Sequence, residues 1–249
     1  MHYLKKIIPS FAKDTVNNIH AYLLFVSDFQ KFRDLAKIKK RFQIIWKNRN
    51  PQLHDRTGVT GFDRHYVYHT AWAARKIVAI KPELHTDISS ILYFSTMVSA
   101  FIPVEFYDYR PADIVLDNLK SKHADLTKLP FPNDSLKTLS CMHVVEHIGL
   151  GRYGDPIDPE GDLKAINELK RVVAPGGSLL FVVPIGKPLI QFNAHRIYSY
   201  RMIMNYFSNW ELKEFALIPE REGGIIIGAT EIEADKELYG CGCFWFVRK

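Results

Sequence analysis

Two histidines stand where a proton acceptor would be useful. His147 lies shortly after an apolar stretch, Thr138 to Met142, in the pair Glu146-His147, and His195 comes after a second one, Ser178 to Val183. Histidine is the side chain that most often takes up a proton during catalysis near neutral pH. A structural explanation is also open for each: His147 as a packed residue at a helix start, and His195 as a residue of a surface loop.

Aspartates lie at the ends of other predicted strands. Asp87 begins the segment Asp87-Ile-Ser-Ser90, Asp108 closes the next strand, and Asp125 precedes the strand at Thr138. In doubly wound α/β proteins, ligands bind at the carboxyl ends of the strands. Taken singly, an aspartate at such a place is more often a loop cap or a solvated charge. Their order and spacing together indicate a binding site.

The elements that must position these residues alternate along the chain. Apolar runs bounded by turn residues predict strands at His85 to Ile88, Pro103 to Asp108, Thr138 to Met142, Ser178 to Val183, Trp210 to Ile218 and Cys243 to Arg248. Helical spacing predicts helices at His69 to Ile80, Ile91 to Phe101 and Leu163 to Val173. Such alternation indicates a mostly parallel sheet with helices on both faces. The segment Ala174-Pro-Gly-Gly-Ser178 is expected to turn a helix directly into a strand.

This arrangement resembles the class I S-adenosylmethionine-dependent methyltransferases over about residues 61–249. It is closer still to an uncharacterised family of methyltransferase-like proteins associated with surface-polysaccharide genes. That family's pattern is matched by His85-Thr-Asp-Ile-Ser-Ser90 and Asp108-Tyr-Arg-Pro111. The resemblance implies an α/β, Rossmann-like seven-stranded methyltransferase fold with an N-terminal helical extension.

The resemblance also implies S-adenosylmethionine as the cofactor and gives roles to individual residues. The first-strand turn, with Asp87, Ser89 and Ser90, would hold the methionine part. Asp108 would hold the ribose hydroxyls, and Asp125 would meet the adenine amino group. Leu126 would flank the adenine ring, and His143 would line the cofactor. The family's turn contains glycines, which tolerate positive φ and close backbone contact. Serine takes such geometry only at a cost, and Ser89 and Ser90 stand in their place.

The implied activity is methyl transfer to a small, sugar-derived acceptor, free or lipid-linked. His147 and His195 are then the candidate catalytic bases. The missing glycines prompt an alternative, a methyltransferase-like binding or assembly protein without catalytic activity. Nucleic acid is not an expected partner, because no Asn-Pro-Pro-Tyr or Asp-Pro-Pro-Tyr tetrapeptide follows the strand at Thr138.

No metal site is expected from the sequence. Cys141, Cys241 and Cys243 are too few and wrongly spaced for a disulfide framework or a zinc site, and they fit a reducing cytoplasm. Carboxylates of the segment from Gly149 to Asp162 could hold a divalent ion, but an Asp-Pro turn and a helix N-cap explain them at least as well. These acids are Asp155, Asp158 and Asp162.

The positive charge is concentrated at the start of the chain. The protein has 249 residues and a net charge of +6, and residues 1–50 contain 11 Lys and Arg against 3 acids. We expect a basic helical extension at residues 1–60, with a second helical run from Phe29 to Trp46, and a methyltransferase-like domain at residues 61–249. A basic segment predicts contact with an anionic membrane surface or acceptor, in a cytoplasmic, membrane-peripheral protein. A solvated helical face is the alternative.

Overall fold

The computed structural model describes residues 10–37 and 41–249, and the chain divides into two units between Gly61 and Phe62. The first unit contains one long helix, α1 (Ser10–Ala36), and a short 3-10 helix, η1 (Trp46–Asn48). The rings of Phe25 and Phe29 lie 6.2 and 4.8 Å from the Trp46 ring. The second helical run expected up to Trp46 is wrong for residues 41–45, which are not helical, while residues 38–40 lie outside the described residues.

The second unit is built on one sheet with the strand order β3-β2-β1-β4-β5-β10-β8-β9. The first five strands are parallel, and β10 runs antiparallel between β5 and β8. The strands are β1 (His85–Ser89), β2 (Val104–Asp108), β3 (Leu119–His123), β4 (Leu136–Met142), β5 (Val173–Ile185), β8 (Trp210–Ile218), β9 (Ile226–Ile227) and β10 (Gly240–Arg248). The predicted seven-stranded Rossmann-like fold is confirmed, with the two-residue β9 added at one edge.

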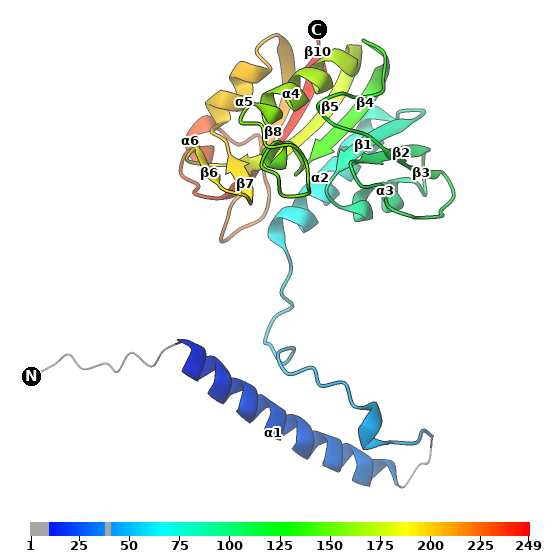
Figure 1. Ribbon diagram of the computed structural model, residues 1–249, viewed down its shortest axis with the longest axis vertical. Helices are drawn as coiled ribbons and strands as arrows, with labels where there is room; N and C mark the ends of the chain where they lie inside the picture. Colours follow the sequence, from blue (N-terminus) through cyan, green and yellow to red (C-terminus); the bar gives the residue numbers. More distant parts are fainter. Residues whose placement is uncertain (1–9, 38–40) are drawn as a thin grey trace, which may run out of the picture. The chain divides into compact units, whose positions relative to one another are not determined.

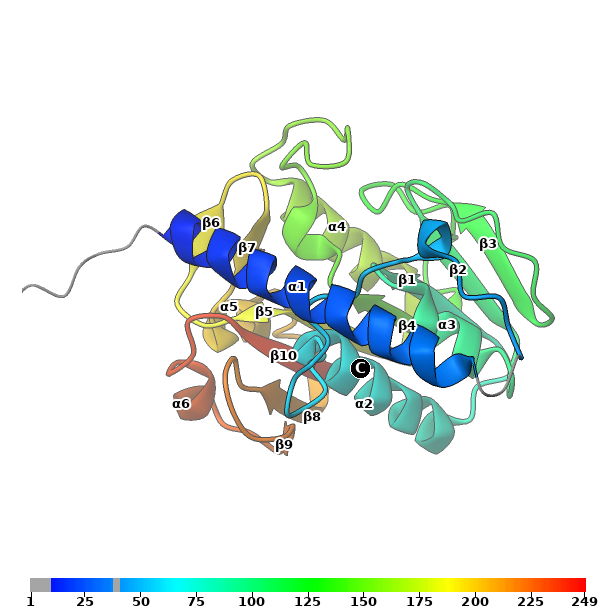
Figure 2. The ribbon, with the colours of Figure 1, turned by 90° about the horizontal axis from the view of Figure 1, so that it is seen from below.

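Helices cover both faces of this sheet (Figure 1). On one face, α2 (Arg64–Ile80) and α3 (Leu92–Val98) bury their apolar side chains. On the other, α4 (Gly161–Val172), α5 (Tyr200–Tyr206) and α6 (Glu231–Ala234) do the same. Figure 2 shows α4 and α2 on opposite sides of the strands. The two faces therefore carry separate apolar cores, and the strand ends between them remain free for a site.

Helix α2 is five residues longer at its start than the sequence suggests. The Asp63 side chain accepts a hydrogen bond from the Tyr66 amide at 3.1 Å and caps the helix. Lys81 ends it in the left-handed conformation, with φ of 53°, immediately before Pro82. The early start matters because it places His65 and Tyr66 beside the carboxyl ends of the central strands.

The Pro-Gly-Gly segment forms a bulge within β5. Val173 pairs with Leu136 and Ser178 pairs with Thr138, so four residues of β5 face a single residue of β4. Gly176 has φ of +75°, which glycine adopts readily. The expected turn from helix to strand is therefore displaced: α4 ends at Val172, and strand pairing begins before the glycines.

Two connections bring further residues to the strand ends. After β4 the chain forms the 3-10 helix η2 (Val145–His147). After β5 it forms a hairpin of β6 (Leu189–Gln191) and β7 (His195–Ile197). Among the described residues, none of the helices has the length and apolar character needed to cross a membrane.

Candidate active site

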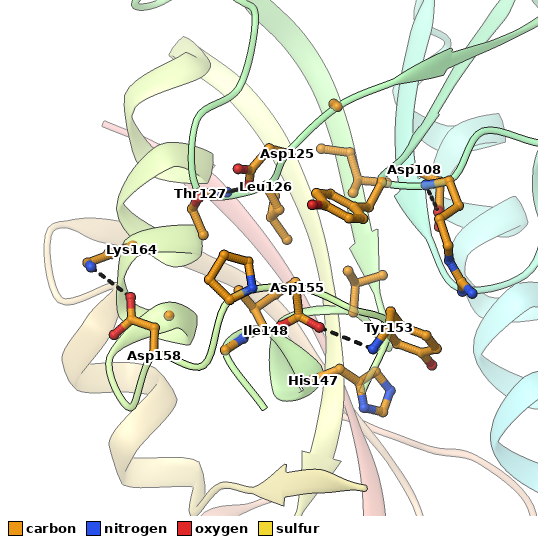
Figure 3. A pocket seen from close by; sticks show the side chains of 18 of the residues that line it. Asp108, Asp125, Leu126, Thr127, His147, Ile148, Tyr153, Asp155, Asp158 and Lys164 are labelled. Carbon is orange, nitrogen blue, oxygen red and sulfur yellow. Dashed lines mark hydrogen bonds and ion pairs between the residues drawn. The ribbon is translucent and has the colours of Figure 1, made fainter. Parts of the chain in front are cut away.

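A cavity of about 290 Å³ lies at the carboxyl ends of β1, β2 and β4. Six of the residues expected to bind cofactor or act in catalysis line this first cavity: Ser90, Asp108, Asp125, Leu126, His143 and His147. In Figure 3, Asp108, Asp125 and Leu126 lie along one side and His147 and Tyr153 along the opposite side. The sheet thus brings together side chains that are up to 57 residues apart in the sequence.

The two acids of the first cavity are held by their own loops. Asp108 Oδ1 accepts a hydrogen bond from the Arg110 amide at 2.7 Å. Asp125 Oδ1 accepts two bonds from Thr127, from the amide at 2.8 Å and from the hydroxyl at 2.7 Å. In both cases the bonds use Oδ1, and the loop fixes the orientation of the carboxylate. Both acids can therefore accept hydrogen bonds from hydroxyl or amino groups of a bound molecule.

The turn after β1 is made without glycine and without positive φ. Among the described non-glycine residues, φ is positive at Lys81, Asn118, Asp134 and His143, and Ser89 and Ser90 are not in this group. The Ser90 amide donates to the Met142 carbonyl at 3.1 Å, and its hydroxyl lies 3.2 Å from the Tyr66 hydroxyl. The expected backbone cost of serine at this turn is therefore absent.

Asp87 and Ser89 do not line the first cavity, contrary to expectation. Both are fully buried within β1. Asp87 accepts hydrogen bonds from the hydroxyls of Ser89, Ser95 and Ser140, which join β1 to α3 and β4. Burial raises the pKa of Asp87 to about 6, and the three hydroxyl donors act against this rise. Asp87 and Ser89 thus lie at the centre of the sheet, and Ile88 and Ser90 are the residues of this segment that line the cavity.

A second cavity, of about 550 Å³, adjoins the first. The two cavities share three lining residues, His143, His147 and Tyr153. Other residues that line the second cavity come from several segments. Arg64 and His65 lie at the start of α2, Arg152 in the loop after η2, His195 in the β6–β7 hairpin and Tyr239 just before β10. A molecule in the first cavity and one in the second would meet at these three residues.

His147 has the tautomer that a base requires. Its Nδ1 lies 2.6 Å from the Ala194 carbonyl oxygen, which only accepts, so Nδ1 carries the hydrogen and Nε2 a lone pair. Arg152 Nη1 is also 3.4 Å from Nδ1, but its better bond is to the same carbonyl, at 3.0 Å. Burial lowers the pKa of His147 below its ordinary 6.5, which keeps the ring neutral near pH 7.

His195 lies in the second cavity beside His147. Their ring centroids are 6.4 Å apart, and the His195 ring stacks on Tyr239 at 4.9 Å. Burial also lowers the pKa of His195, and its Nε2 is buried without a hydrogen-bond partner. The structure thus brings the two predicted bases together at the second cavity.

The His143 side chain is directed into the protein interior. Its Nδ1 lies 2.8 Å from Glu146 Oε1, and its Nε2 lies 3.4 Å from Cys241 Sγ. The backbone of His143 has φ of +55°, an unusual conformation for a non-glycine residue. Its imidazole is therefore already paired on both nitrogens, and its expected role along the cofactor falls to its backbone and ring edge.

Glu146 is a site residue that the sequence analysis missed. It is 1% exposed, and burial raises its pKa to about 7. It contacts His143 as described above, and its Oε1 also lies 3.9 Å from His147 Nε2. The sequence signal was present in the run His143-Val-Val-Glu-His147, in which the acid stands between two histidines. A carboxylate with a pKa near 7 beside histidines is typical of a functional site.

The acids between Gly149 and Asp162 have structural partners. Asp155 accepts from the Gly149 and Tyr153 amides, at 2.9 and 3.1 Å. Asp158 accepts from the Glu160 amide and from Lys164 Nζ. Buried Asp162 accepts from the Tyr198 hydroxyl at 3.0 Å, and its Oδ1 lies 3.6 Å from Arg196 Nε. Each acid therefore stabilises a turn or the start of α4.

Comparison with known proteins supports the fold and names a family. Residues 85–218 match the family described as "Caenorhabditis protein of unknown function, DUF268". No curated protein matches the chain. Among solved structures, the YcgJ protein from Bacillus subtilis has a TM-score of 0.51 at 12% identity, covering 73% of this chain and 98% of that one. A "putative sarcosine dimethylglycine methyltransferase from Galdieria sulphuraria" has a TM-score of 0.50 at 10% identity, covering 72% and 85%. At these identities the likeness shows the fold.

Proposed function

We propose that this chain, which belongs to the family described as "Caenorhabditis protein of unknown function, DUF268", is an S-adenosylmethionine-dependent methyltransferase. The acceptor that we propose is a small, sugar-derived molecule. One observation carries the proposal: Ser90, Asp108 and Asp125, in the order of the methyltransferase pattern, line one cavity that adjoins a second, histidine-lined cavity. Solved structures with the same fold include one titled as a methyltransferase, which supports the assignment.

The residues of the first cavity fit the parts of this cofactor. Asp108 would accept hydrogen bonds from the two ribose hydroxyls, and Asp125 would accept one from the adenine amino group. Buried Leu126 would pack against the adenine ring. Ser90, at the end of β1, would meet the methionine part. The bound cofactor supplies an activated methyl group on a sulfonium, so the protein mainly has to align the two reactants.

The second cavity fits a polar acceptor. Tyr66, Tyr153 and Tyr239 offer aromatic faces. Charged side chains of both signs also line the cavity, namely Arg64, Arg152, Asp63, Glu146 and Glu220, so it offers both donors and acceptors to the hydroxyl groups of a sugar. His147 lines both cavities, so its Nε2 lone pair is placed to take the proton of an acceptor hydroxyl as that oxygen attacks the methyl group. His195 is the second candidate for this role.

Isothermal calorimetry with S-adenosylmethionine tests the cofactor assignment. We expect binding by the wild type, and binding weaker by about 10- to 100-fold for Asp108→Ala, because hydrogen bonds to a charged group contribute about 1.5–3 kcal/mol. Asp113→Ala is the matched control, since this exposed acid follows in the same loop and does not line the cavity. Folded wild-type protein that releases no heat at high micromolar cofactor would exclude the proposal.

A screen with radiolabelled cofactor then tests the acceptor class. Nucleotide-linked and lipid-linked sugars should accept label, whereas generic RNA and DNA should not. Transfer of label to nucleic acid in preference to every sugar would overturn the acceptor assignment and leave the cofactor assignment intact.

A further inference from the structure

Three potential metal ligands from distant parts of the chain meet beside the two cavities. His65 comes from the first turn of α2, His143 follows β4, and Cys241 lies in β10. One ligand atom from each lies within 4.8 Å of the other two, and all three residues are buried. We propose that this cluster binds one divalent transition-metal ion, of which zinc fits the ligands best, with an open fourth position toward the second cavity.

The chemistry of the three ligands selects this class of ion. Two imidazoles and one thiolate suit zinc, whereas magnesium and calcium prefer oxygen ligands. Zinc–nitrogen and zinc–sulfur bonds of about 2.0 and 2.3 Å place tetrahedral ligand atoms roughly 3.3–3.7 Å apart. The observed 3.4 Å between His143 Nε2 and Cys241 Sγ already has this spacing. The His65 ring is stacked on the His143 ring at 5.5 Å with an angle of 13° between them, so binding requires the His65 ring to rotate until its nitrogen points at the ion.

His143 has the surroundings of a metal ligand. Its Nδ1 lies 2.8 Å from Glu146 Oε1, so Nε2 is the nitrogen that is directed toward Cys241. Histidine ligands usually donate their other nitrogen to a carboxylate or carbonyl in this way. The positive φ of His143, +55°, aims the side chain into the cluster at the expense of a common backbone conformation. Strain of this kind is typical of functional sites.

His69, which lies beside the cluster, also has an oxygen atom as the partner of its Nδ1. The His69 ring lies 5.1 Å from the His143 ring, and its Nδ1 is 2.6 Å from the His65 carbonyl oxygen. Because a carbonyl only accepts, Nε2 of His69 is left as a lone pair, and this atom is buried without a partner. An unpaired buried lone pair is costly, so a nearby cation, directly or through a bound water, accounts for it.

The Cys241 sulfur is placed beside the histidine ligand. Cys241 is fully buried in β10, and its Sγ lies 3.4 Å from His143 Nε2. A metal ion would bind this sulfur as the thiolate, with release of the thiol proton. A simple hydrogen bond from the Cys241 thiol to His143 Nε2 would satisfy these two residues, but it leaves His69 Nε2 without a partner.

The open position faces the proposed acceptor. His65 and His143 line the second cavity, whereas Cys241 does not, so the free side of the ion is the side of the cavity. There it would hold an acceptor oxygen or an anionic group beside His147. This role rests on the proposed function, but the binding of the ion itself does not.

Metal analysis of the full chain, freed of any histidine tag, tests the site. We expect about one zinc per chain by mass spectrometry after dialysis. Cobalt titration should give an intense thiolate-to-cobalt absorption band, which Cys241→Ser abolishes. Cys243→Ser is the matched control, because its sulfur lies only 4.0 Å from that of Cys241 and its side chain is equally buried. This control should keep both the band and the metal.

X-ray absorption of the zinc-loaded wild type does not depend on any variant folding. We expect one sulfur and two or three nitrogen or oxygen neighbours around the ion. Glu146→Gln should weaken metal binding by about 10- to 100-fold, as loss of a carboxylate partner does at other zinc histidines. A wild type without zinc, a spectrum without sulfur, or a Cys243→Ser variant that loses the metal would each overturn the proposal. None of these readouts uses S-adenosylmethionine.

Discussion

At the scale of single residues, His147 is the group through which the two cavities act together. The Ala194 carbonyl fixes its Nδ1 hydrogen, and burial holds its ring neutral. A neutral imidazole whose remaining nitrogen carries a lone pair is the form that accepts a proton. The same carbonyl also binds Arg152, so the hairpin that carries Ala194 positions both the base and a positive charge.

His147→Gln should lower kcat by about 10²- to 10⁴-fold with an acceptor found in the screen, because glutamine cannot take up the proton. Cofactor affinity should change little. In the wild type, kcat/KM should fall as pH decreases through the lowered pKa of His147, so the acid limb should lie below the ordinary 6.5. His54→Gln, in the first unit, is the control. An acid limb unchanged by His147→Gln would assign the base elsewhere, with His195 next to be tested.

Asp87 illustrates how a predicted ligand residue can serve the fold instead. Its carboxylate takes three hydroxyl hydrogen bonds from β1, α3 and β4, all out of contact with water. Because burial raises its pKa to about 6, the folded state binds more protons than the unfolded state between 3.8 and about 6. The contribution of Asp87 to the free energy of unfolding is therefore largest below pH 3.8 and falls as pH rises through this window.

Urea unfolding of wild type and Asp87→Asn from pH 4 to 8 measures this effect. Relative to the variant, the wild type should lose up to about 3 kcal/mol between pH 4 and 6 and then stay level. Asp87→Ala should destabilise by roughly 2–5 kcal/mol at every pH, because three buried hydroxyls lose their acceptor. Asp113→Ala should lie within about 0.5 kcal/mol of the wild type. A pH-independent difference between wild type and Asp87→Asn would contradict the assigned titration.

The sequence placed the residues at strand ends well and those inside strands poorly. Asp108 and Asp125 follow or close their strands, so the topology of the sheet alone carries them to the cavity. Asp87 and Ser89 lie inside β1, where every residue is buried, and their partners come from α3 and β4. Such partners are set by packing between segments far apart in sequence. The cluster of His65, His143 and Cys241 escaped notice for the same reason.

At the scale of elements, the bulge in β5 sets the register of the central sheet. It lets Val173 and Ser178 both pair with β4 although four residues separate them, and β5 then continues to Ile185. The space inside the bulge is small. A β-carbon on Gly177 would lie 2.8 Å from the Ala174 carbonyl oxygen and 2.9 Å from that of Leu136. Both oxygens belong to the backbone and cannot move away as a flexible side chain can.

Gly177→Ala should therefore lower the free energy of unfolding by roughly 1–3 kcal/mol, as overpacking in a tight site does. Gly224→Ala is the control, since a β-carbon there would meet nothing within 4 Å. Its effect should stay within about 0.5 kcal/mol. Equal stability of the two variants in urea would show that the bulge can relax and that its glycine is dispensable.

Helices and strands with regular apolar spacing were predictable, and their ends and some turns were not. Strand β8 begins and ends where the pattern places it. Helix α2 starts five residues early because of the Asp63 cap, a local hydrogen bond that outweighs the weak pattern of residues 64–68. The expected run up to Trp46 is wrong for residues 41–45, and the Trp46 ring contacts α1 at Phe25 and Phe29. Contacts of this kind join segments that are apart in the sequence, so helical spacing does not reveal them.

At the scale of the whole molecule, charge and apolar exposure are both concentrated in the first unit. Residues 1–50 have a balance of +8, and the remaining residues have −2. On α1, Ile19, Leu23, Phe32 and Leu35 are each more than half exposed. Helix α1 itself has three basic residues and three acids, so the positive charge lies in the residues that flank it, where it attracts anionic surfaces. We propose that this unit contacts an anionic membrane surface, where a lipid-linked acceptor would be found.

Cosedimentation with vesicles tests this contact in the full-length protein. Binding should require phosphatidylserine, should be absent with phosphatidylcholine alone, and should weaken as salt rises, because surface charges are screened. Each basic residue near such a surface contributes about 1 kcal/mol, so Lys31→Gln combined with Lys47→Gln should weaken binding by about 30-fold. The matched control is Lys120→Gln combined with Lys187→Gln, two exposed lysines of the second unit. Since the second unit has no net positive charge, the control should bind vesicles as the wild type does. An equal loss of binding in both double variants would place the membrane contact outside the first unit.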